Sequence, residues 1–181
     1  MPATDAPFVF LDRDGVINRD SDEYIKSAAE WVPLPGSLEA IAALTAAGLR
    51  CIVISNQSGI GRGLFNEATL ADIHAAMRAA VEAAGGRIAA IYHCPHRPGD
   101  DCDCRKPKPG MLLRAAAELG FDARGVPLIG DKVSDIAAAV AAGARPIAVG
   151  SRPGERFPPG VERYPDLAAA AKMLIAERRE R

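Results

Sequence analysis

Short uninterrupted apolar runs recur along the chain, and the longer segments between them carry apolar residues at every third or fourth position. A short apolar run is typical of a strand buried on both faces, whereas the longer spacing is typical of an amphipathic helix. Buried strands are therefore predicted at 8–11, 51–54, 88–92, 126–129 and 146–149.

Helices are predicted between these strands, and some of them begin at a polar residue that can cap free backbone N–H groups. The predicted N-caps are Ser37, Asn66 and Ser134. Glycines follow several of the helical segments, as expected where a helix stops. The predicted helices span 37–47, 67–84, 110–119, 135–142 and 166–178.

Strands and helices alternate at the length of crossover connections, which predicts one Rossmann-like α/β domain over 1–181. We expect a mainly parallel sheet with helices on both faces and no cap domain. In such sheets ligands bind at the carboxyl ends of the strands, so polar residues that follow a strand are candidates for a site. Residues 1–7 are expected to form a loose leader, and 150–160 a loop rich in Pro and Gly.

Composition narrows the class of protein further. Of the 181 residues 49% are hydrophobic and 25% are charged, which is ordinary for a globular domain. The formal net charge of −1 argues against broad electrostatic binding of nucleic acid or of an acidic membrane. No apolar run approaches the ~20 residues of a membrane span, and the start of the chain lacks the pattern of a secretory signal. We therefore expect a cytoplasmic monomer that acts on a small molecule.

Aspartates directly follow two of the predicted strands. The run FVFL ends in Asp12 and Asp14, and Asp131 follows the strand at 126–129. Either cluster alone could be an acidic turn, but carboxylates at neighbouring strand ends form the kind of oxygen site that Mg²⁺ prefers. Asp12, ionised at neutral pH, is a competent nucleophile toward phosphorus, and Asp14 can transfer a proton. Asp135 either orients the metal site or occupies a favourable place in the first turn of a helix.

Other polar groups suit a phosphate. Ser55 and the backbone N–H groups of the glycine-rich turn after it can hold phosphate oxygens, while Lys106 supplies a point charge and Arg105 a bidentate clamp. The sequence Arg-Lys-Pro-Lys alone is more often a basic surface loop, but its place beside a predicted strand end favours the functional interpretation. The polar segment 19–33 is either part of the site or a solvated loop pinned by its aromatic residues.

Three sulfurs and one imidazole lie within eleven residues, at Cys94, His96, Cys102 and Cys104. Such ligands match a closed tetrahedral zinc site, although the one-residue spacing in each pair is tighter than the commoner spacing of two. The alternatives are a disulfide from Cys94 or free thiols. We expect zinc to fix the loop at about 93–106 and to take no part in the chemistry, since no coordination position stays open.

The remaining cysteine and the two remaining histidines are not assigned to a site. Cys51 lies within a predicted strand and is expected to be buried packing, while His74 lies beside the apolar stripe of a helix. His93 would face away from Cys94 because neighbouring residues of a strand point to opposite faces.

The motif DRDGVIN, Ser55, Lys106 and the motif GDKVSD occur in the order of the four motifs of the haloacid dehalogenase superfamily of phosphotransferases, which the chain resembles over nearly its whole length. Within it, the segments NQSGIGRG and CPH…CDCRKPKPGML are similar to the branch that removes the 7-phosphate of D-glycero-D-manno-heptose 1,7-bisphosphate. In that branch a zinc loop replaces the cap domain. Its product is used for nucleotide-activated heptose, a precursor of lipopolysaccharide core or other surface glycans.

The resemblance implies a role for each matching residue. Asp12 would be the nucleophile that forms a phosphoaspartate, and Asp14 the acid/base. Mg²⁺ would be held by Asp12, Asp131 and the backbone carbonyl of Asp14, while zinc would be structural. Ser55, Arg105 and Lys106 would stabilise the phosphoryl group. The residues expected to contact the substrate are Asp20, Ser21, Asp22, Glu23, Tyr24, Asn56, Gln57, Ser58 and Arg62.

Two alternatives stay open. The short loop between His96 and Cys102 is similar to that of histidinol-phosphate phosphatases, and the stretch 20–24 is one residue longer than in some heptose enzymes. Ser58, Arg62 and the pair Gly110-Met111 favour the heptose substrate. A protein of another class, a zinc-bearing binding module with an inactive site, is disfavoured by the neutral charge and the intact set of aspartates.

Overall fold

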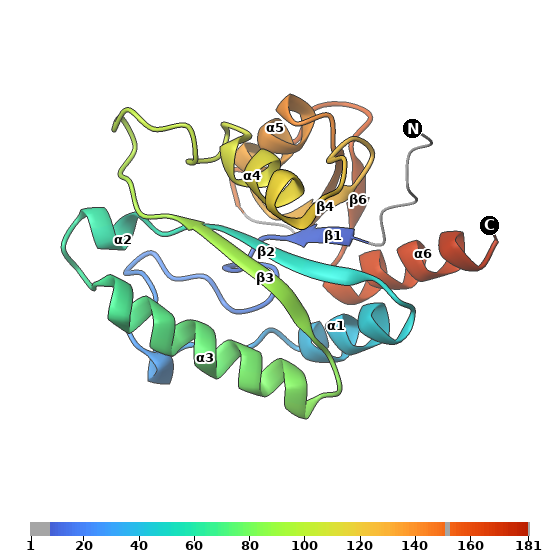
Figure 1. Ribbon diagram of the computed structural model, residues 1–181, viewed down its shortest axis with the longest axis horizontal. Helices are drawn as coiled ribbons and strands as arrows, with labels where there is room; N and C mark the ends of the chain where they lie inside the picture. Colours follow the sequence, from blue (N-terminus) through green and yellow to red (C-terminus); the bar gives the residue numbers. More distant parts are fainter. Residues whose placement is uncertain (1–7, 151–152, 181) are drawn as a thin grey trace.

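A six-stranded sheet in the order β3-β2-β1-β4-β5-β6 organises the computed structural model, which describes residues 8–150 and 153–180 (Figure 1). Every pair of neighbouring strands is parallel, so the predicted α/β fold class is confirmed. The leader expected over 1–7 lies outside the described residues. The strands are β1 (Phe8–Leu11), β2 (Arg50–Asn56), β3 (Ile88–Cys94), β4 (Pro127–Gly130), β5 (Arg145–Val149) and β6 (Glu162–Tyr164).

Helices cover both faces of the sheet. Figure 1 shows α1, α3 and α6 on one face and α4 and α5 on the other, which is the arrangement that right-handed crossovers between parallel strands produce. No separate cap domain occurs among the residues that the structure describes. The helices are η1 (Ala28–Glu30), α1 (Ser37–Ala46), α2 (Ser58–Gly61), α3 (Glu67–Ala83), α4 (Gly110–Leu119), α5 (Val133–Ala141) and α6 (Leu167–Arg179).

The apolar residues of β1 contribute to two cores because side chains alternate along a strand. Val9 and Leu11 pack in the core beneath α1, α3 and α6, whereas Phe8 and Phe10 pack in the core beneath α4 and α5. All four side chains are buried, which explains why the run is uninterrupted by polar residues. The end of β1 is thereby held at the centre of the sheet.

The register of the sheet brings the candidate residues together. Leu11 pairs with Val53 of β2 and with Ile129 of β4, and Asp12 N donates to Ile129 O at 3.0 Å. The residues that follow these three strands therefore lie side by side at the carboxyl edge, as expected for an open parallel sheet.

Two predicted helix caps are wrong. The N-cap of α1 is Gly36, and Ser37 is its first residue, with Oγ donating to Ile17 O at 2.6 Å. The N-cap of α5 is Lys132, whose backbone N–H donates to Asp135 at 3.1 Å, in place of Ser134. Ser37 is thus held by the segment after β1, whereas α5 is capped locally, by a bond between Lys132 and the side chain of Asp135 in its first turn. Asn66 is confirmed as a cap, since its side chain accepts from Thr69 N at 2.9 Å.

Three elements were not predicted, of which the first is the short helix η1 within the segment 19–33. The short helix α2 follows β2 within a segment expected to be a glycine-rich turn, and β6 follows the Pro- and Gly-rich loop as a strand of only three residues. The segment 19–33 is held by Trp31, which is buried in the core, so its pinning by an aromatic residue is confirmed. Cys51 is also buried, as predicted.

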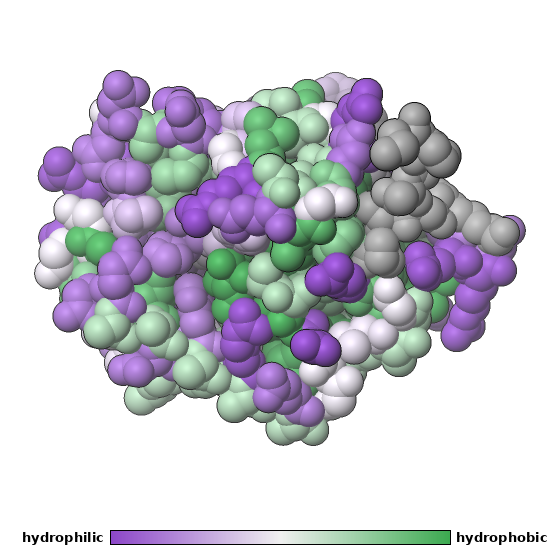
Figure 2. Space-filling view, in the orientation of Figure 1, coloured by the Kyte–Doolittle hydropathy of each residue, from purple (hydrophilic) through white to green (hydrophobic). Residues whose placement is uncertain are grey.

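Polar and apolar residues are mixed on the face of the molecule in Figure 2. Large hydrophobic side chains that stay exposed are few among the described residues: Val133 and Val140 lie on α5, and Val32, Leu64 and Leu113 lie on three other segments. None of the helices in the described part of the chain is both long and apolar enough to cross a membrane.

Candidate active site

Three carboxylates converge at the carboxyl edge of the sheet. Asp12 directly follows β1, Asp131 directly follows β4, and Asp135 lies in the first turn of α5. One oxygen of each lies within 4.8 Å of the others, and all three residues are buried. Buried carboxylates this close repel one another, so the cluster suits a cation bound between them.

Burial and the neighbouring carboxylates raise the pKa values of Asp131 and Asp12. Burial, with the charge of Asp12 as the second cause, raises the pKa of Asp131 to about 8. Burial and then the charge of Asp135 raise the pKa of Asp12 above its ordinary value. Positive charge from nearby groups or from a metal ion therefore favours the ionised forms of Asp12 and Asp131.

Lys106 supplies one positive charge inside the cluster. Its Nζ lies 2.8 Å from Asp12 Oδ1 and 2.6 Å from Asp135 Oδ1, and it donates to Ile54 O at 2.8 Å. Burial lowers the pKa of Lys106, but Asp12 and Asp135 outweigh burial, so that the pKa is raised overall. Lys106 therefore keeps its charge beside Asp12 over the whole physiological pH range. Asp135 contacts this charge in addition to its place at the start of α5.

An amide at the end of β2 holds the backbone of Lys106. Asn56 Nδ2 donates to Lys106 O at 3.0 Å, and Lys106 N donates to Asn56 Oδ1 at 3.0 Å. Asn56 was expected to contact substrate, yet both polar atoms of its side chain bond to this backbone. Arg105, the preceding residue, donates from Nη1 to His96 O at 3.3 Å. The loop that carries both cations is thus fixed on two sides.

Asp14 is held separately from the carboxylate cluster. It accepts hydrogen bonds from Asn18 Nδ2 at 2.8 Å, from Gln57 Nε2 at 2.9 Å and from Arg13 Nε at 3.0 Å. Gln57 Nε2 also donates to the hydroxyl oxygen of Ser55 at 2.7 Å. One amide therefore connects the candidate acid/base with the candidate phosphate-binding serine.

A cavity of about 500 Å³ opens at this edge. Glu23 and Arg62 do not line it, and Ser55 and Asp131 are buried residues next to lining residues rather than part of its wall. The predicted site residues that line the cavity are Asp12, Asp14, Asp20, Ser21, Asp22, Tyr24, Asn56, Gln57, Ser58, Arg105 and Lys106.

Lys132 also lines the cavity and was not assigned a role from the sequence. Its Nζ lies 3.0 Å from Asp20 Oδ2, so an ion pair joins the loop after β1 to the start of α5. Burial lowers the pKa of Lys132, but Asp12, Asp131 and Asp20 outweigh burial and raise it. Sequence reasoning could have found Lys132 from its position directly after Asp131, because Lys132 also follows the carboxyl end of a predicted strand.

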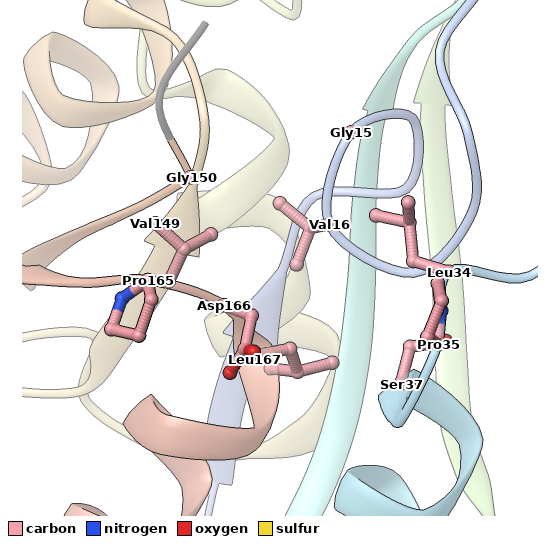
Figure 3. Close-up of a pocket in the computed structure, with 10 residues that line it drawn as sticks. All are labelled: Gly15, Val16, Leu34, Pro35, Ser37, Val149, Gly150, Pro165, Asp166 and Leu167. Carbon is pink, nitrogen blue, oxygen red and sulfur yellow. The ribbon is translucent and has the colours of Figure 1, made fainter.

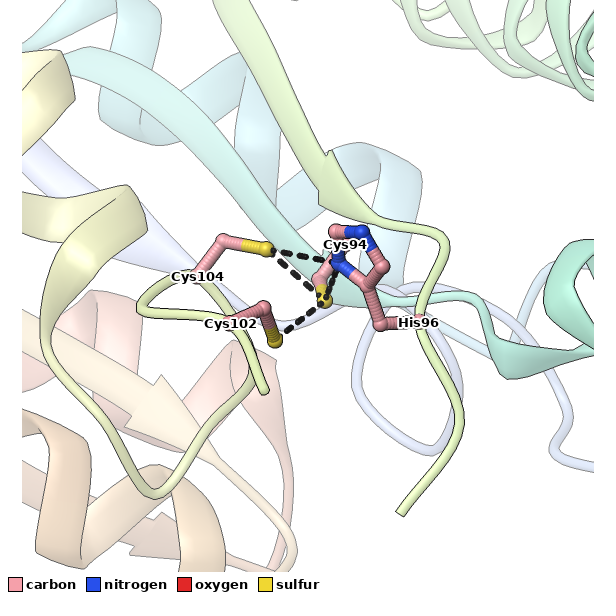
Figure 4. A group of neighbouring side chains, drawn as sticks. All are labelled: Cys94, His96, Cys102 and Cys104. Atoms are coloured by element: carbon pink, nitrogen blue, oxygen red, sulfur yellow. Dashed lines mark hydrogen bonds between the residues drawn. The ribbon is translucent and has the colours of Figure 1, made fainter. Parts of the chain in front are cut away.

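The cysteines and histidine of the predicted zinc loop lie together at the end of β3 and on the loop that follows (Figure 4). Cys94 Sγ lies 3.9 Å from Cys102 Sγ and 2.9 Å from Cys104 Sγ, and His96 Nδ1 lies 3.4 Å from Cys94 Sγ. A tetrahedral zinc ion with Zn–S bonds of about 2.3 Å holds its sulfurs about 3.8 Å apart. The separation of Cys94 and Cys102 matches this value, whereas Cys94 and Cys104 would have to move apart by about 0.9 Å to share the ion. All four cysteines of the chain are free, so a disulfide from Cys94 is absent. His93 points elsewhere and pairs with Glu67 at 2.9 Å.

A second cavity, of about 360 Å³, lies between the starts of α1 and α6 (Figure 3). Its polar side chains are already engaged, since Ser37 donates to Ile17 O and Asp166 accepts from Ala169 N. The cavity therefore lacks the convergent charges of the first one. Its apolar lining residues are Val16, Leu34, Pro35, Val149, Pro165 and Leu167.

The sequence and the fold were compared with those of known proteins. The chain is 49% identical over 172 residues to D-glycero-beta-D-manno-heptose-1,7-bisphosphate 7-phosphatase of Pseudomonas putida, and the match covers 92% of this chain and 98% of that protein. The fold is similar, with a TM-score of 0.89 and 46% identity, to the crystal structure of D,D-heptose 1,7-bisphosphate phosphatase of Bordetella bronchiseptica complexed with magnesium and phosphate. That similarity covers 94% of this chain and 98% of the other.

The corresponding phosphatase of Burkholderia thailandensis is similar with a TM-score of 0.72 and 39% identity, over 93% of this chain and 98% of that one. Residues 4–143, which include Asp12, Lys106 and Asp131, match haloacid dehalogenase-like hydrolases. The chain belongs to the haloacid dehalogenase-like hydrolase family.

Proposed function

We propose that the protein is a Mg²⁺-dependent phosphatase that removes the 7-phosphate of D-glycero-D-manno-heptose 1,7-bisphosphate. The observation that carries this proposal is the group formed by Asp12, Asp131 and Lys106, in which a nucleophilic carboxylate lies beside a fixed positive charge and a second carboxylate. Similarity to heptose phosphatases over nearly the whole chain supports the substrate. The product would be a heptose 1-phosphate for nucleotide-activated heptose, used in lipopolysaccharide core or other surface glycans.

The carboxylate cluster fits a magnesium ion. Magnesium binds one or two carboxylates and keeps waters and phosphate oxygens as its other ligands, so Asp12 and Asp131 with the backbone carbonyl of Asp14 are a sufficient protein set. The raised pKa of Asp131 supports the fit, because a nearby dication would favour its ionised form. The Bordetella bronchiseptica relative was crystallised with magnesium and phosphate. When bound, the ion would neutralise charge on the phosphoryl oxygens.

The residues of the chain divide the reaction between them. A carboxylate oxygen of Asp12 attacks phosphorus, so that a bond from Asp12 to phosphorus forms as the bond to the sugar oxygen breaks, and Asp14 gives that oxygen a proton. A water molecule then gives a proton to Asp14 and attacks phosphorus, the bond to Asp12 breaks, and inorganic phosphate leaves. Lys106, Ser55 and Arg105 stabilise the charge on the phosphoryl oxygens during both steps.

The sugar would lie in the cavity next to this centre. Asp20, Ser21, Asp22 and Tyr24 line the cavity on the side of the loop after β1, and Ser58 lines it at the start of α2. These side chains are proposed to hydrogen-bond the hydroxyl groups of the heptose. Glu23 and Arg62, which do not line the cavity, would reach the substrate only if their side chains turned toward it, and Asn56 and Gln57 would act mainly by holding neighbouring residues.

We propose that the cluster of Cys94, His96, Cys102 and Cys104 holds a structural zinc ion. The short separations between its sulfurs and the absence of disulfides support this assignment. Burial raises the pKa of the Cys94 thiol to about 12, which a zinc ion would reverse, since coordination deprotonates a thiol. The ion would fix the loop that leads to Arg105 and Lys106.

Phosphate release from purified protein with Mg²⁺ tests the proposal. Heptose 1,7-bisphosphate and histidinol phosphate are compared at equal concentration, and we expect a clear preference for the heptose. Asp12→Asn should remove phosphoryl transfer while the protein stays folded, because the attacking oxygen is lost and uncatalysed hydrolysis is slower by a factor of up to ~10²¹. A preference for histidinol phosphate would show that the assignment of the heptose substrate is wrong. Inactivity on every sugar phosphate, together with tight polynucleotide binding, would instead support a binding module.

A further inference from the structure

Arg13 lies between the two aspartates of the first motif, and its side chain is the largest among the fully buried ones, with 0% exposed. Burial of a guanidinium group costs free energy unless the charge is paired and hydrogen-bonded. A leucine or methionine would fill a comparable volume without this cost. The arginine therefore needs an explanation in terms of its contacts rather than its packing.

These contacts form a fork on Asp14. Arg13 Nε donates to Asp14 Oδ1 at 3.0 Å, and Nη2 donates to Asp14 Oδ2 at 3.1 Å. Two parallel bonds from a planar guanidinium fix the plane of a carboxylate as well as its distance, which a single charge such as an ammonium group cannot do.

Arg13 also fixes the orientation of Gln57. Nη2 donates to Gln57 Oε1 at 3.3 Å, and this leaves Gln57 Nε2 to donate to Asp14 at 2.9 Å and to Ser55 Oγ at 2.7 Å. The opposite orientation of the amide would place its N–H groups against the N–H groups of the guanidinium. Arg13 thus determines which atom of Gln57 faces the acid/base and the serine.

No second cation competes for this carboxylate in the part of the chain that the structure describes, where Arg13 is the residue ion-paired with Asp14. His74 lies near, but burial and then the charge of Arg13 lower the pKa of His74 to about 3, so its imidazole is neutral. Asn18 and Gln57 also donate to Asp14, but Arg13 alone among the three carries a charge and contacts both carboxylate oxygens.

We infer that Arg13 is the positioning residue of the proton-transfer steps. It binds Asp14 directly and, by orienting Gln57, helps to fix the position of Asp14 relative to Ser55. The inference deepens the proposed function and rests on it. Arg13 serves the step in which Asp14 gives a proton to the sugar oxygen as the phosphorus–oxygen bond breaks. It also serves the later step in which water returns a proton to Asp14 as the bond from phosphorus to Asp12 breaks. Arg13 is fully buried and does not line the cavity, so it acts through Asp14 and Gln57 and not by contact with the substrate.

Leaving groups of different basicity test this role. The oxygen of a sugar phosphate needs a proton to leave, whereas p-nitrophenolate leaves without one. Arg13→Met should lower kcat/KM for heptose 1,7-bisphosphate by about 100-fold or more, in the range of general acid–base catalysis, while the first release of p-nitrophenolate from p-nitrophenyl phosphate should slow by less than about tenfold. Later turnovers should be slow, since attack by water also needs Asp14, and the progress curve should show a burst equal to the enzyme concentration.

A double-mutant cycle shows whether Arg13 acts through Asp14. Arg13→Met added to Asp14→Asn should cause little further loss, because the group that Arg13 positions is already gone. Multiplied losses would overturn the inference. Arg124→Met is the matched control, since Arg124 is an exposed arginine paired with Asp122, and this change should leave both substrates unaffected.

A second variant is available in case Arg13→Met does not fold. Gln57→Leu allows the same comparison of leaving groups, and we expect a smaller loss of activity that again affects heptose 1,7-bisphosphate more than p-nitrophenyl phosphate. A variant with normal thermal unfolding could instead lose activity equally on both substrates and show no burst. That result would overturn the positioning role and leave the proposed function intact. Wild-type protein that releases phosphate from neither substrate would instead remove the proposed function on which the inference rests.

Discussion

At the scale of single residues, the carboxylate cluster depends on how closely the backbone approaches it. Gly15 has a φ of +88°, and a Cβ built there would lie 2.1 Å from Asp131 Oδ2. Any side chain at this position would displace the carboxylate of Asp131 from its place in the cluster. Gly15→Ala should therefore weaken Mg²⁺ binding by about tenfold or more, in the way that displacement of a group supporting a metal ligand usually does. The Mg²⁺ dependence of activity and calorimetric titration both measure this.

Gly85→Ala separates displacement of Asp131 from backbone strain. Gly85 has the same φ of +88°, but nothing lies within 4 Å of the Cβ that would be added. Both changes should cost on the order of 1 kcal/mol of stability, since alanine is strained at positive φ. Only Gly15→Ala should alter the Mg²⁺ affinity. Equal affinities in the two variants would show that Asp131 tolerates the displacement.

The charge of Asp131 gives the metal-free protein a characteristic pH dependence. Its folded-state pKa of about 8 lies above the ordinary value of 3.8, so the folded state binds more protons than the unfolded state between these values. Stability should therefore fall as the pH rises from about 4 to about 8, by up to about 1.4 kcal/mol per pH unit for one proton. Urea unfolding in the presence of a chelator measures the slope.

Asp131→Asn tests the origin of this slope, because an amide does not titrate. The variant should lose much of the pH dependence, and saturating Mg²⁺ should flatten it in the wild type by favouring the ionised carboxylates. An unchanged slope in Asp131→Asn would assign the effect to other groups, of which Asp12 has the next claim because its pKa is also raised.

Residues that directly follow a strand were predictable, whereas their partners were not. Asp12 and Asp131 were assigned to one site because each follows a strand-like run, and Lys106 because its basic loop was expected beside that strand-end site. The structure places the three together. The contacts of Asn56 with Lys106 and of Gln57 with Arg13 join residues 50 and 44 positions apart. Such pairs depend on the final approach of two loops, which hydrophobic periodicity does not encode.

At the scale of elements, the loop after β3 has little regular structure and needs another source of order. Cys102→Ser should lower the zinc content and loosen residues 94–106, because one of the proposed ligands is lost. Activity should fall as well, since Arg105 and Lys106 end this loop. Metal analysis and hydrogen exchange of the loop measure the two effects.

Cys51→Ala is the control for that loop. Cys51 is buried in the core and lies outside the cluster, so its truncation should cost some stability and leave the zinc content unchanged. Full zinc content in Cys102→Ser would contradict the assignment of four ligands.

Elements with strong periodicity were predicted almost to the residue, and those without it were missed. The helix predicted at 110–119 is α4, because its apolar spacing and the following Gly120 agree. The strand β6 has the sequence Glu-Arg-Tyr, which shows no apolar run, and it is added to the sheet by pairing with β5. Its position is thus decided by tertiary contacts.

At the scale of the whole molecule, the two ends of the sheet have different tasks. The carboxyl ends of β1, β2 and β4 carry the candidate site, while the amino end of β5 begins with Arg145, which binds Glu162 of β6 and Glu177 of α6. These bonds tie the last strand and the last helix to the sheet. Stability and chemistry are therefore expected to respond to different substitutions.

Arg145→Met should lower stability without changing catalysis. Its side chain is about one quarter exposed, so the two ion pairs are partly screened and their loss should cost about 1–2 kcal/mol, which lowers Tm by about 2–8 °C in a chain of this size. The kcat for heptose 1,7-bisphosphate should stay within about twofold, because the network lies at the end of the sheet opposite Asp12.

Arg114→Met is the control, since Arg114 pairs with Glu118 on the exposed surface of one helix and should contribute no more than about 0.5 kcal/mol. If kcat fell in Arg145→Met while Tm stayed constant, the two ends of the sheet would be coupled, and the separation of stability from chemistry would be wrong.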